Sequence, residues 1–177
     1  WVRLRRFLKH LEKKREVLRI SRPVDVAYEA GAIADLLVKN DGPAVVFEQP
    51  RLADGSISPM PLVMNLFGSH QRTLDALGAS HETEVGDRMT AMMKPDIGTF
   101  VKRPWKALPL ARDAFAMPPR KKRFRAPCQQ VRMKDPDLTQ LPIPKTWPMD
   151  GGHFVTLPLV VTKDPNSGEH NLGMYRA

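Results

Sequence analysis

Residues 150–176 read DGGHFVTLPLVVTKDPNSGEHNLGMYR and decide the fold class of the C-terminal part of the chain. An apolar run over residues 154–162 leads into the turn sequence DPNSG at residues 164–168, and a second run follows over residues 171–176. Turn residues between two such runs predict a β-hairpin. Because a lone hairpin is marginally stable in water, its sheet partners are either earlier strands or absent from this chain.

The chain before the hairpin is rich in proline. Residues 141–144 read LPIP, and Trp147-Pro148 follows. Proline fixes φ and has no N–H, so this stretch predicts a rigid, extended path. Residues 102–134 hold eleven Lys or Arg against one acid and have weak periodicity. They predict a basic, Pro-rich connector.

Residues 1–101 alternate between helix-like and strand-like patterns, which predicts a small α/β domain with a central sheet. Leu4, Phe7, Leu8 and Leu11 have the spacing of an amphipathic helix. The other expected helices cover residues 26–39, a short segment between Ser69 and Gly78, and residues 82–93. The expected strands cover residues 17–20, 44–47 and 62–65. We therefore divide the chain into residues 1–101, the connector 102–134, and residues 135–177.

The ends of these elements also carry expectations. Asp25 is the expected N-cap of the second helix, and Ser69 is the expected cap of the third. Arg22-Pro23 is expected to close the first strand, and residues 49–56 are expected to form a loop. The stripe expected to be buried on the second helix comprises Ala30, Ile33, Ala34 and Leu37.

Composition excludes several classes of protein. The chain has 177 residues, with 28 Lys or Arg, 19 Asp or Glu and a formal net charge of +9. Its one cysteine, Cys128, excludes an internal disulfide framework and a Cys-cluster zinc site. No apolar run approaches the roughly 18–20 residues that span a bilayer, and the first residues do not resemble a signal peptide. These features predict a cytoplasmic protein without a membrane segment.

The densest charge cluster is RKKRFR at residues 120–125. It has two readings: a solvated part of the connector, or a site that binds phosphates or nucleic acid. The sequence has no RNA- or DNA-binding signature to support the second reading. A basic, nucleic-acid-associated protein that uses residues 102–134 stays open as an alternative.

Several motifs together resemble the UbiD family of reversible, non-oxidative decarboxylases that use prenylated FMN. They are DGGHFVT at residues 150–156, the DP…G turn, and NLGMYR at residues 171–176. The LPIP and WP motifs fit the same pattern, as does NLFGS at residues 65–69 with Arg72 and Leu77-Gly78. The resemblance implies that the hairpin opens a split β-barrel, the flavin-binding domain of that family. The implied fold class is α/β (α+β).

The resemblance also implies a site. The residues that it brings to prenylated FMN are Thr156, Asn171, Gly173, Met174, Tyr175 and Arg176. Asn171 would be a metal ligand, since an amide oxygen suits Mn²⁺ or Mg²⁺. Arg176 would be the catalytic residue, whose planar guanidinium can hold a substrate carboxylate. K⁺ is a further candidate ion.

The implied function is a carboxy-lyase that acts on an aromatic or α,β-unsaturated carboxylic acid. The implied partners are a flavin prenyltransferase that supplies the cofactor and further copies of the chain, in a dimer or hexamer. In that family a His and a Glu that complete the metal site, and the catalytic acids, follow the strand that leads to the arginine. We therefore expect this chain to be the N-terminal portion of a protein more than twice as long, and inactive by itself. A flavin-binding module without catalysis is the other alternative.

Overall fold

The computed structural model describes residues 4–94, 105, 108–116, 118, 130–132 and 134–176. Residues 2–72 together with 137–177 form one compact unit, and residues 73–136 belong to the other. The domain limits that we predicted at residues 101 and 134 are not tested by this division and remain predictions. Residues 120–125 and Cys128 lie outside the described residues.

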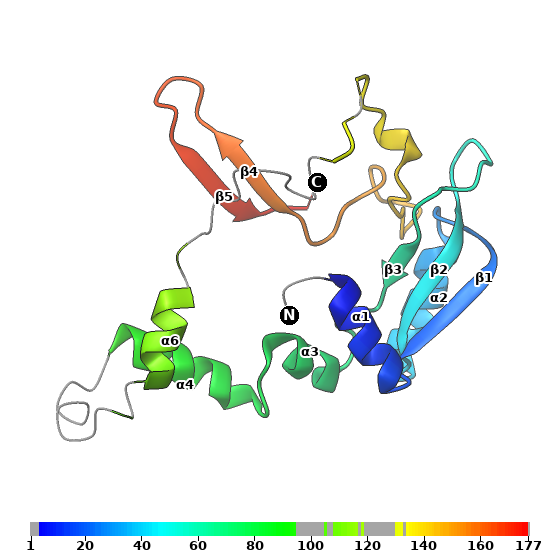
Figure 1. The fold of residues 1–177 in the computed structure, drawn as a ribbon. Helices are drawn as coiled ribbons and strands as arrows, with labels where there is room; N and C mark the ends of the chain where they lie inside the picture. The colour runs from blue at the N-terminus through cyan, green and yellow to red at the C-terminus, as the bar shows by residue number, and fades with distance from the viewer. Residues whose placement is uncertain are drawn as a thin grey trace. The chain divides into compact units, whose positions relative to one another are not determined.

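The first unit is built on a three-stranded sheet in the order β1-β2-β3 (Figure 1). Strands β1 (Val17–Asp25) and β2 (Ala44–Arg51) are parallel, and β3 (Leu62–Met64) runs antiparallel to β2. Parallel neighbours need a crossover, which helix α2 (Glu29–Lys39) provides. The mixture of helices and small sheets confirms the predicted α/β class.

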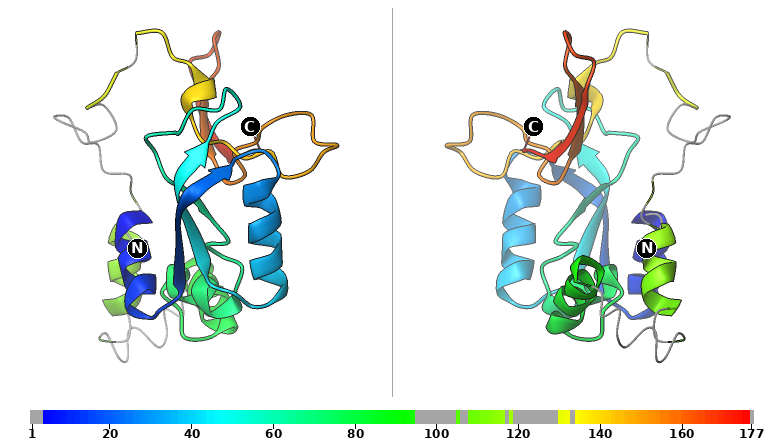
Figure 2. Two further views of the ribbon diagram at one scale, coloured as in Figure 1. Left: turned by 90° about the vertical axis from the view of Figure 1, so that its right-hand side faces the viewer. Right: turned by 90° about the vertical axis from the view of Figure 1, so that its left-hand side faces the viewer.

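Helices α1 (Leu4–Lys13) and α2 lie on opposite faces of this sheet (Figure 2). Side chains alternate between the faces of a strand, and Ala44, Val45, Val46 and Phe47 are all buried. A strand that is buried on both faces reads as a continuous apolar run, as β2 does.

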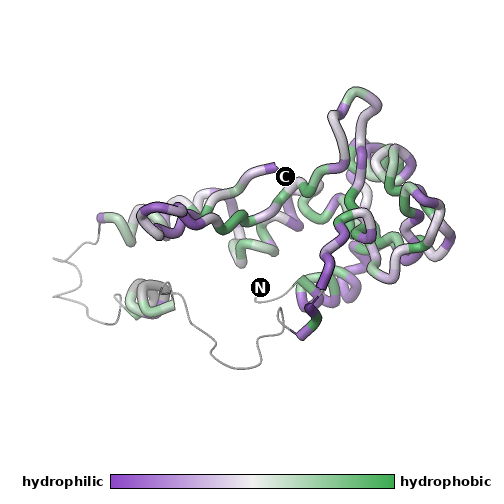
Figure 3. Tube along the Cα trace, turned by 90° about the horizontal axis from the view of Figure 1, so that it is seen from above, coloured by the Kyte–Doolittle hydropathy of each residue, from purple (hydrophilic) through white to green (hydrophobic). Residues whose placement is uncertain are grey.

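The two helices differ in which of their side chains are buried. In α2, Ala30 and Ala34 are buried, and Ala30 joins a core with Val24, Val45 and Phe47. In α1, Phe7 and Leu11 are buried, at 4% and 0% exposed, whereas Leu8 is half-buried, Leu4 is exposed and the other side chains are polar. Figure 3 accordingly shows both apolar and polar residues around the turns of α1. The predicted amphipathic helix is confirmed.

Three predicted boundaries in this unit are wrong. Strand β1 continues through Pro23, with a register shift between Ile20 and Pro23. Strand β2 continues to Arg51 instead of ending in a loop. Asp25 is not an N-cap, because it ends β1 and its N–H donates to the Glu29 carboxylate at 2.9 Å.

Helix α3 (His70–Leu77) begins after Ser69, whose Oγ accepts the N–H of Arg72 at 3.2 Å. It ends at Gly78, which has φ +65, a conformation that glycine adopts without strain. Helix α4 (Glu82–Met93) follows as predicted. Both predicted helix ends at Ser69 and Gly78 are confirmed.

The second unit contains α4 and α6 (Leu108–Ala116), which contact each other. Helix α6 falls inside the predicted connector, where we expected no regular structure. Its proline comes at the second helical position, in the first turn, where no intrahelical bond from an N–H is needed.

The chain returns to the first unit through the short 3-10 helix η3 (Leu138–Gln140). An extended stretch then binds the edge of the N-terminal fold: the N–H of Tyr28 donates to the Lys145 carbonyl at 2.8 Å. The Lys145 N–H donates in turn to the Val26 carbonyl at 3.1 Å. The predicted extended path is confirmed for this stretch.

Strands β4 (Leu159–Lys163) and β5 (His170–Met174) pair antiparallel in a sheet of their own. The predicted hairpin is confirmed, but both strands are shorter than expected. Among the described residues, no helix is long and apolar enough to cross a membrane.

Candidate functional site

The hairpin turn is held by one carboxylate. Asp164 accepts the N–H groups of Ser167 at 2.7 Å and of Asn166 at 2.8 Å. The N–H of Gly168, at φ +73, donates to the Asp164 carbonyl at 3.0 Å. The hydrogen bonds from the Ser167 and Asn166 backbones lower the pKa of Asp164 below its ordinary value. This turn sets the register that pairs Asn171 with Thr162.

The register assigns the predicted site residues to two faces. Residues directly opposite in an antiparallel pair share a face. Asn171 and Gly173 therefore share a face with their partners Thr162 and Val160. Met174 lies on the opposite face, among exposed apolar residues that comprise Leu159, Val161 and Leu172. Of the residues within β5, the structure thus brings Asn171 and Gly173 together and separates Met174's side chain from them.

Gly173 lies against the ring of Tyr175. A Cβ added at Gly173 would meet Cε2 of Tyr175 at 2.4 Å and Cζ at 2.8 Å. The absence of a side chain at residue 173 thus lets the ring approach the strand. Tyr175 as a whole is 54% exposed.

Arg176 follows the end of β5 by two residues, and the predicted strand to Arg176 stops at Met174. Its guanidinium Cζ lies 4.3 Å from the ring centroid of Phe154. The N–H of Phe154 donates to the Pro144 carbonyl at 3.1 Å. Phe154 is a site residue that the sequence analysis missed, because no local pattern connects it to Arg176.

Thr156 is not on a strand that faces β5, because the chain from residue 154 to 158 is irregular and β4 starts at Leu159. It lines a cavity of about 650 Å³. Walls of this cavity come from residues 62–68, 142–144 and 154–157 and are mostly apolar. Thr156 and Phe154 both line it, whereas Asn171 and residues 173–176 do not.

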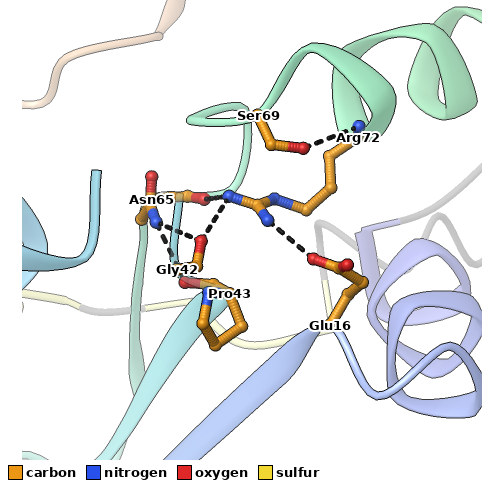
Figure 4. Close-up of polar contacts among 6 residues, drawn as sticks. All are labelled: Glu16, Gly42, Pro43, Asn65, Ser69 and Arg72. Carbon is orange, nitrogen blue, oxygen red and sulfur yellow. Dashed lines mark hydrogen bonds and ion pairs between the residues drawn. The ribbon is translucent and has the colours of Figure 1, made fainter. Parts of the chain in front are cut away.

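The NLFGS loop and Arg72 form a buried polar cluster (Figure 4). Arg72 is 1% exposed, and its Nη1 donates to the Glu16 carboxylate at 2.7 Å. Its Nη2 donates to the carbonyls of Gly42 at 3.0 Å and Asn65 at 3.3 Å. The Asn65 amide donates to the carbonyls of Gly42 and Pro43. This cluster ties β1, β3 and α3 together and stabilises the fold.

The described residues contain no group of three or more His, Cys, Asp or Glu side chains that could hold a metal ion.

Two family models match the chain. The N-terminal domain of 3-octaprenyl-4-hydroxybenzoate carboxy-lyase matches residues 8–92. The Rift-related domain of the same carboxy-lyase matches residues 120–177. Together the two matches cover most of the chain, and it belongs to the UbiD family, as its resemblance implied.

Known proteins are similar to this chain over nearly all of its length. An uncharacterized protein of Archaeoglobus fulgidus is 37% identical over 173 residues, which are 98% of this chain and 34% of that protein. The vanillic acid decarboxylase of Sedimentibacter hydroxybenzoicus, in closed form, is similar with a TM-score of 0.71 and 27% identity. The alignment covers 99% of this chain and 34% of that one.

A second solved structure shares the fold. The UbiD-class enzyme HmfF from Pelotomaculum thermopropionicum, in complex with FMN, has a TM-score of 0.70 at 23% identity. It aligns with 98% of this chain and with 33% of its own length. The chain thus spans about a third of the length of the relatives it matches.

Proposed function

We propose that the whole protein is a reversible, non-oxidative decarboxylase that acts on an aromatic or α,β-unsaturated carboxylic acid. The observation that carries the proposal is the match of residues 120–177 to the Rift-related domain of a carboxy-lyase. A solved vanillic acid decarboxylase that is similar over 99% of this chain supports the same reaction class. The proposed cofactors are prenylated FMN and Mn²⁺ or Mg²⁺, with K⁺ as a further candidate.

Asn171 is the proposed metal ligand on this chain. It is exposed on β5, and its side-chain amide hydrogen-bonds no other described residue. An amide oxygen is a hard ligand that suits Mn²⁺ or Mg²⁺. One oxygen cannot hold a divalent ion, so the remaining ligands are proposed to come from elsewhere in the whole protein.

Gly173 and Tyr175 are the proposed contacts to the flavin ring on the same face as Asn171. The missing side chain at residue 173 lets the Tyr175 ring lie against β5, and the flavin is proposed to contact this face with the ring in that position. Met174 is proposed to contribute its backbone, since its side chain belongs to the opposite face. Thr156 is proposed to bind from the cavity wall.

Arg176 is the proposed catalytic residue, which binds and orients the substrate carboxylate. Its guanidinium N–H groups hydrogen-bond no other described residue, so its donors are available to a carboxylate. A planar guanidinium binds a carboxylate through two parallel hydrogen bonds, which fixes orientation as well as charge. When bound, prenylated FMN supplies the electron sink for loss of CO₂.

The test uses the whole protein, co-expressed with a flavin prenyltransferase as the cofactor-supplying partner. We expect bound flavin with a divalent metal, CO₂ release from a hydroxybenzoate-type or cinnamate-type acid, and exchange of labelled CO₂ into that acid. Protein that binds flavin but releases and exchanges no CO₂ from either class would indicate the non-catalytic flavin module. Protein that binds neither flavin nor metal would overturn the proposal.

Two variants assign the roles within the proposal. Asn171→Ala should lower the metal content per protomer, whereas Asn166→Ala, in the hairpin turn, should not. Arg176→Ala should abolish decarboxylation while the fold is retained, because it removes a charge from an exposed side chain. Equal metal content in both asparagine variants would contradict the role of Asn171. Gel filtration of the same protein tests the proposed homo-oligomer.

A further inference from the structure

The side chain of Arg176 lies against an aromatic ring. Its guanidinium Cζ lies over the Phe154 ring at 4.3 Å from the centroid. A guanidinium within about 6 Å of a ring centroid is attracted by the ring quadrupole. Because Arg176 lies beyond the last ladder pair of β5, the ladder does not restrict its side chain. The ring therefore supplies a restraint that the strand does not.

The backbone of Phe154 is in turn anchored to the proline-rich stretch. Its N–H donates to the Pro144 carbonyl at 3.1 Å. The preceding residue, His153, hydrogen-bonds the Ile143 carbonyl through Nδ1 at 2.6 Å. Two adjacent residues are thus anchored to two adjacent carbonyls.

That stretch is anchored to the N-terminal fold. Lys145 exchanges backbone hydrogen bonds with Val26 and Tyr28, at 3.1 and 2.8 Å. Tyr28 has φ 67, a conformation that is rare for a bulky residue and persists only where neighbours enforce it. A continuous series of backbone contacts therefore leads from β1 and α2 to the ring under Arg176.

We infer that Phe154 is a positioning residue that orients the guanidinium of Arg176. Contact with a ring uses the charge of a guanidinium and leaves its N–H donors free for a carboxylate. Because the side chain is already fixed before the substrate binds, less conformational entropy is lost on binding. The catalytic meaning of this contact rests on the function proposed for Arg176, but the contact itself can be tested separately.

The separate test measures the rate at which phenylglyoxal modifies Arg176 in the whole, flavin-loaded protein, by peptide mass spectrometry. Phe154→Leu removes the ring face and keeps an apolar side chain, so the rate should rise roughly threefold to tenfold. Phe154→Trp keeps a ring face and should stay near the wild-type rate. Phe67→Leu makes the same change at another aromatic residue of the cavity and should leave the rate unchanged.

A second variant keeps the shape of the ring. Pentafluorophenylalanine at position 154 reverses the ring quadrupole at almost the same volume, so it should release Arg176 as Phe154→Leu does. A wild-type modification rate with the fluorinated ring would overturn the inference, even if Phe154→Leu fails to fold.

Kinetics connect the contact to the reaction. Phe154→Leu should lower kcat/KM for the acid at unchanged flavin content, and Phe154→Trp should restore it. If the wild-type protein decarboxylates but Phe154→Leu changes neither kcat/KM nor the modification rate, the positioning role of Phe154 is refuted and the proposed function stands. If the wild-type protein has no activity but Phe154→Leu still speeds modification, the proposed function fails and the positioning contact stands.

Discussion

Arg72 and Glu16 form an ion pair of 2.7 Å between a buried guanidinium and a half-exposed carboxylate. The Arg72 side chain is 1% exposed and the Glu16 side chain 43%. The carboxylate can therefore rehydrate if the pair breaks, whereas loss of the guanidinium also removes one of the donors to the carbonyls of Gly42 and Asn65. The contribution of Arg72 thus comes largely from these carbonyls.

Arg72→Met should destabilise the N-terminal fold by about 2–4 kcal/mol, because it removes the hydrogen bonds of a buried guanidinium to the carbonyls of Gly42 and Asn65 as well as the ion pair with Glu16. Glu16→Gln keeps an acceptor at an exposed site and should cost under about 1 kcal/mol. Hydrogen–deuterium exchange of peptides that cover β2 and β3 measures both effects as local opening. Equal losses in the two variants would mean that the ion pair, and not the carbonyl contacts, is the main contribution.

Gly68→Ala should also destabilise this cluster. A Cβ at Gly68 would lie 1.6 Å from Oδ1 of Asn65, so the amide would have to leave the carbonyls of Gly42 and Pro43. Overpacking with loss of two hydrogen bonds should cost about 2–4 kcal/mol, again measured by exchange in β2 and β3.

Gly86→Ala is the matched control for this substitution. Gly86 lies within α4, and a Cβ there would meet nothing within 4 Å. The change should stabilise α4 by about 0.5–1 kcal/mol, because alanine favours helix. A destabilising effect of the same size at both glycines would contradict the proposed clash.

The sequence predicts the N-terminal elements well where the pattern is local. The apolar stripe from Leu4 to Leu11 predicts α1 because burial follows the helical period. Pro23 does not end β1, because β1 is an edge strand and a proline without an N–H is tolerated there. The end of β1 is decided by its pairing with β2, and a local sequence pattern contains no information about that pairing.

The candidate site is predictable from the sequence only where a local pattern determines it. The motif that ends in Arg176 identifies the β5 strand, and alternation within it then separates the Met174 side chain from Asn171. The contact between Phe154 and Arg176 depends on the path of an irregular segment. No periodicity encodes such a path, although an aromatic residue two positions before Thr156 was visible in the sequence.

Asp164 should make the hairpin sensitive to acid. Its pKa is lowered in the folded state by the N–H groups of Ser167 and Asn166. A carboxyl whose folded pKa is depressed stabilises the fold above its unfolded pKa, about 3.9, and loses that contribution as pH falls through the folded value. Hydrogen exchange of β4 and β5, corrected for intrinsic rates, should therefore be constant from pH 7 to 5 and rise below about pH 4.

Asp164→Asn is the control for this titration, because the amide oxygen accepts the same two bonds without ionising. Its exchange should be faster than wild type at pH 7 and should show no rise specific to the hairpin below pH 4. A rise of equal size in the variant would assign the acid sensitivity to another group.

Gly173→Ala should reduce flavin retention through Tyr175. The new methyl group would overlap Cε2, Cζ and Oη of the Tyr175 ring at 2.4, 2.8 and 2.9 Å, so the ring must rotate away. Because Tyr175 is exposed, the hairpin should lose under about 1 kcal/mol, whereas a flavin against this face would meet both the methyl group and the displaced ring. Flavin absorbance per protomer measures the effect.

A double variant tests whether the Tyr175 ring mediates this loss. In a Tyr175→Ala background the same glycine substitution should reduce flavin retention by less, since the two residues are coupled. An equal loss in both backgrounds would mean that the methyl group acts on the flavin directly and that the ring has no part in it.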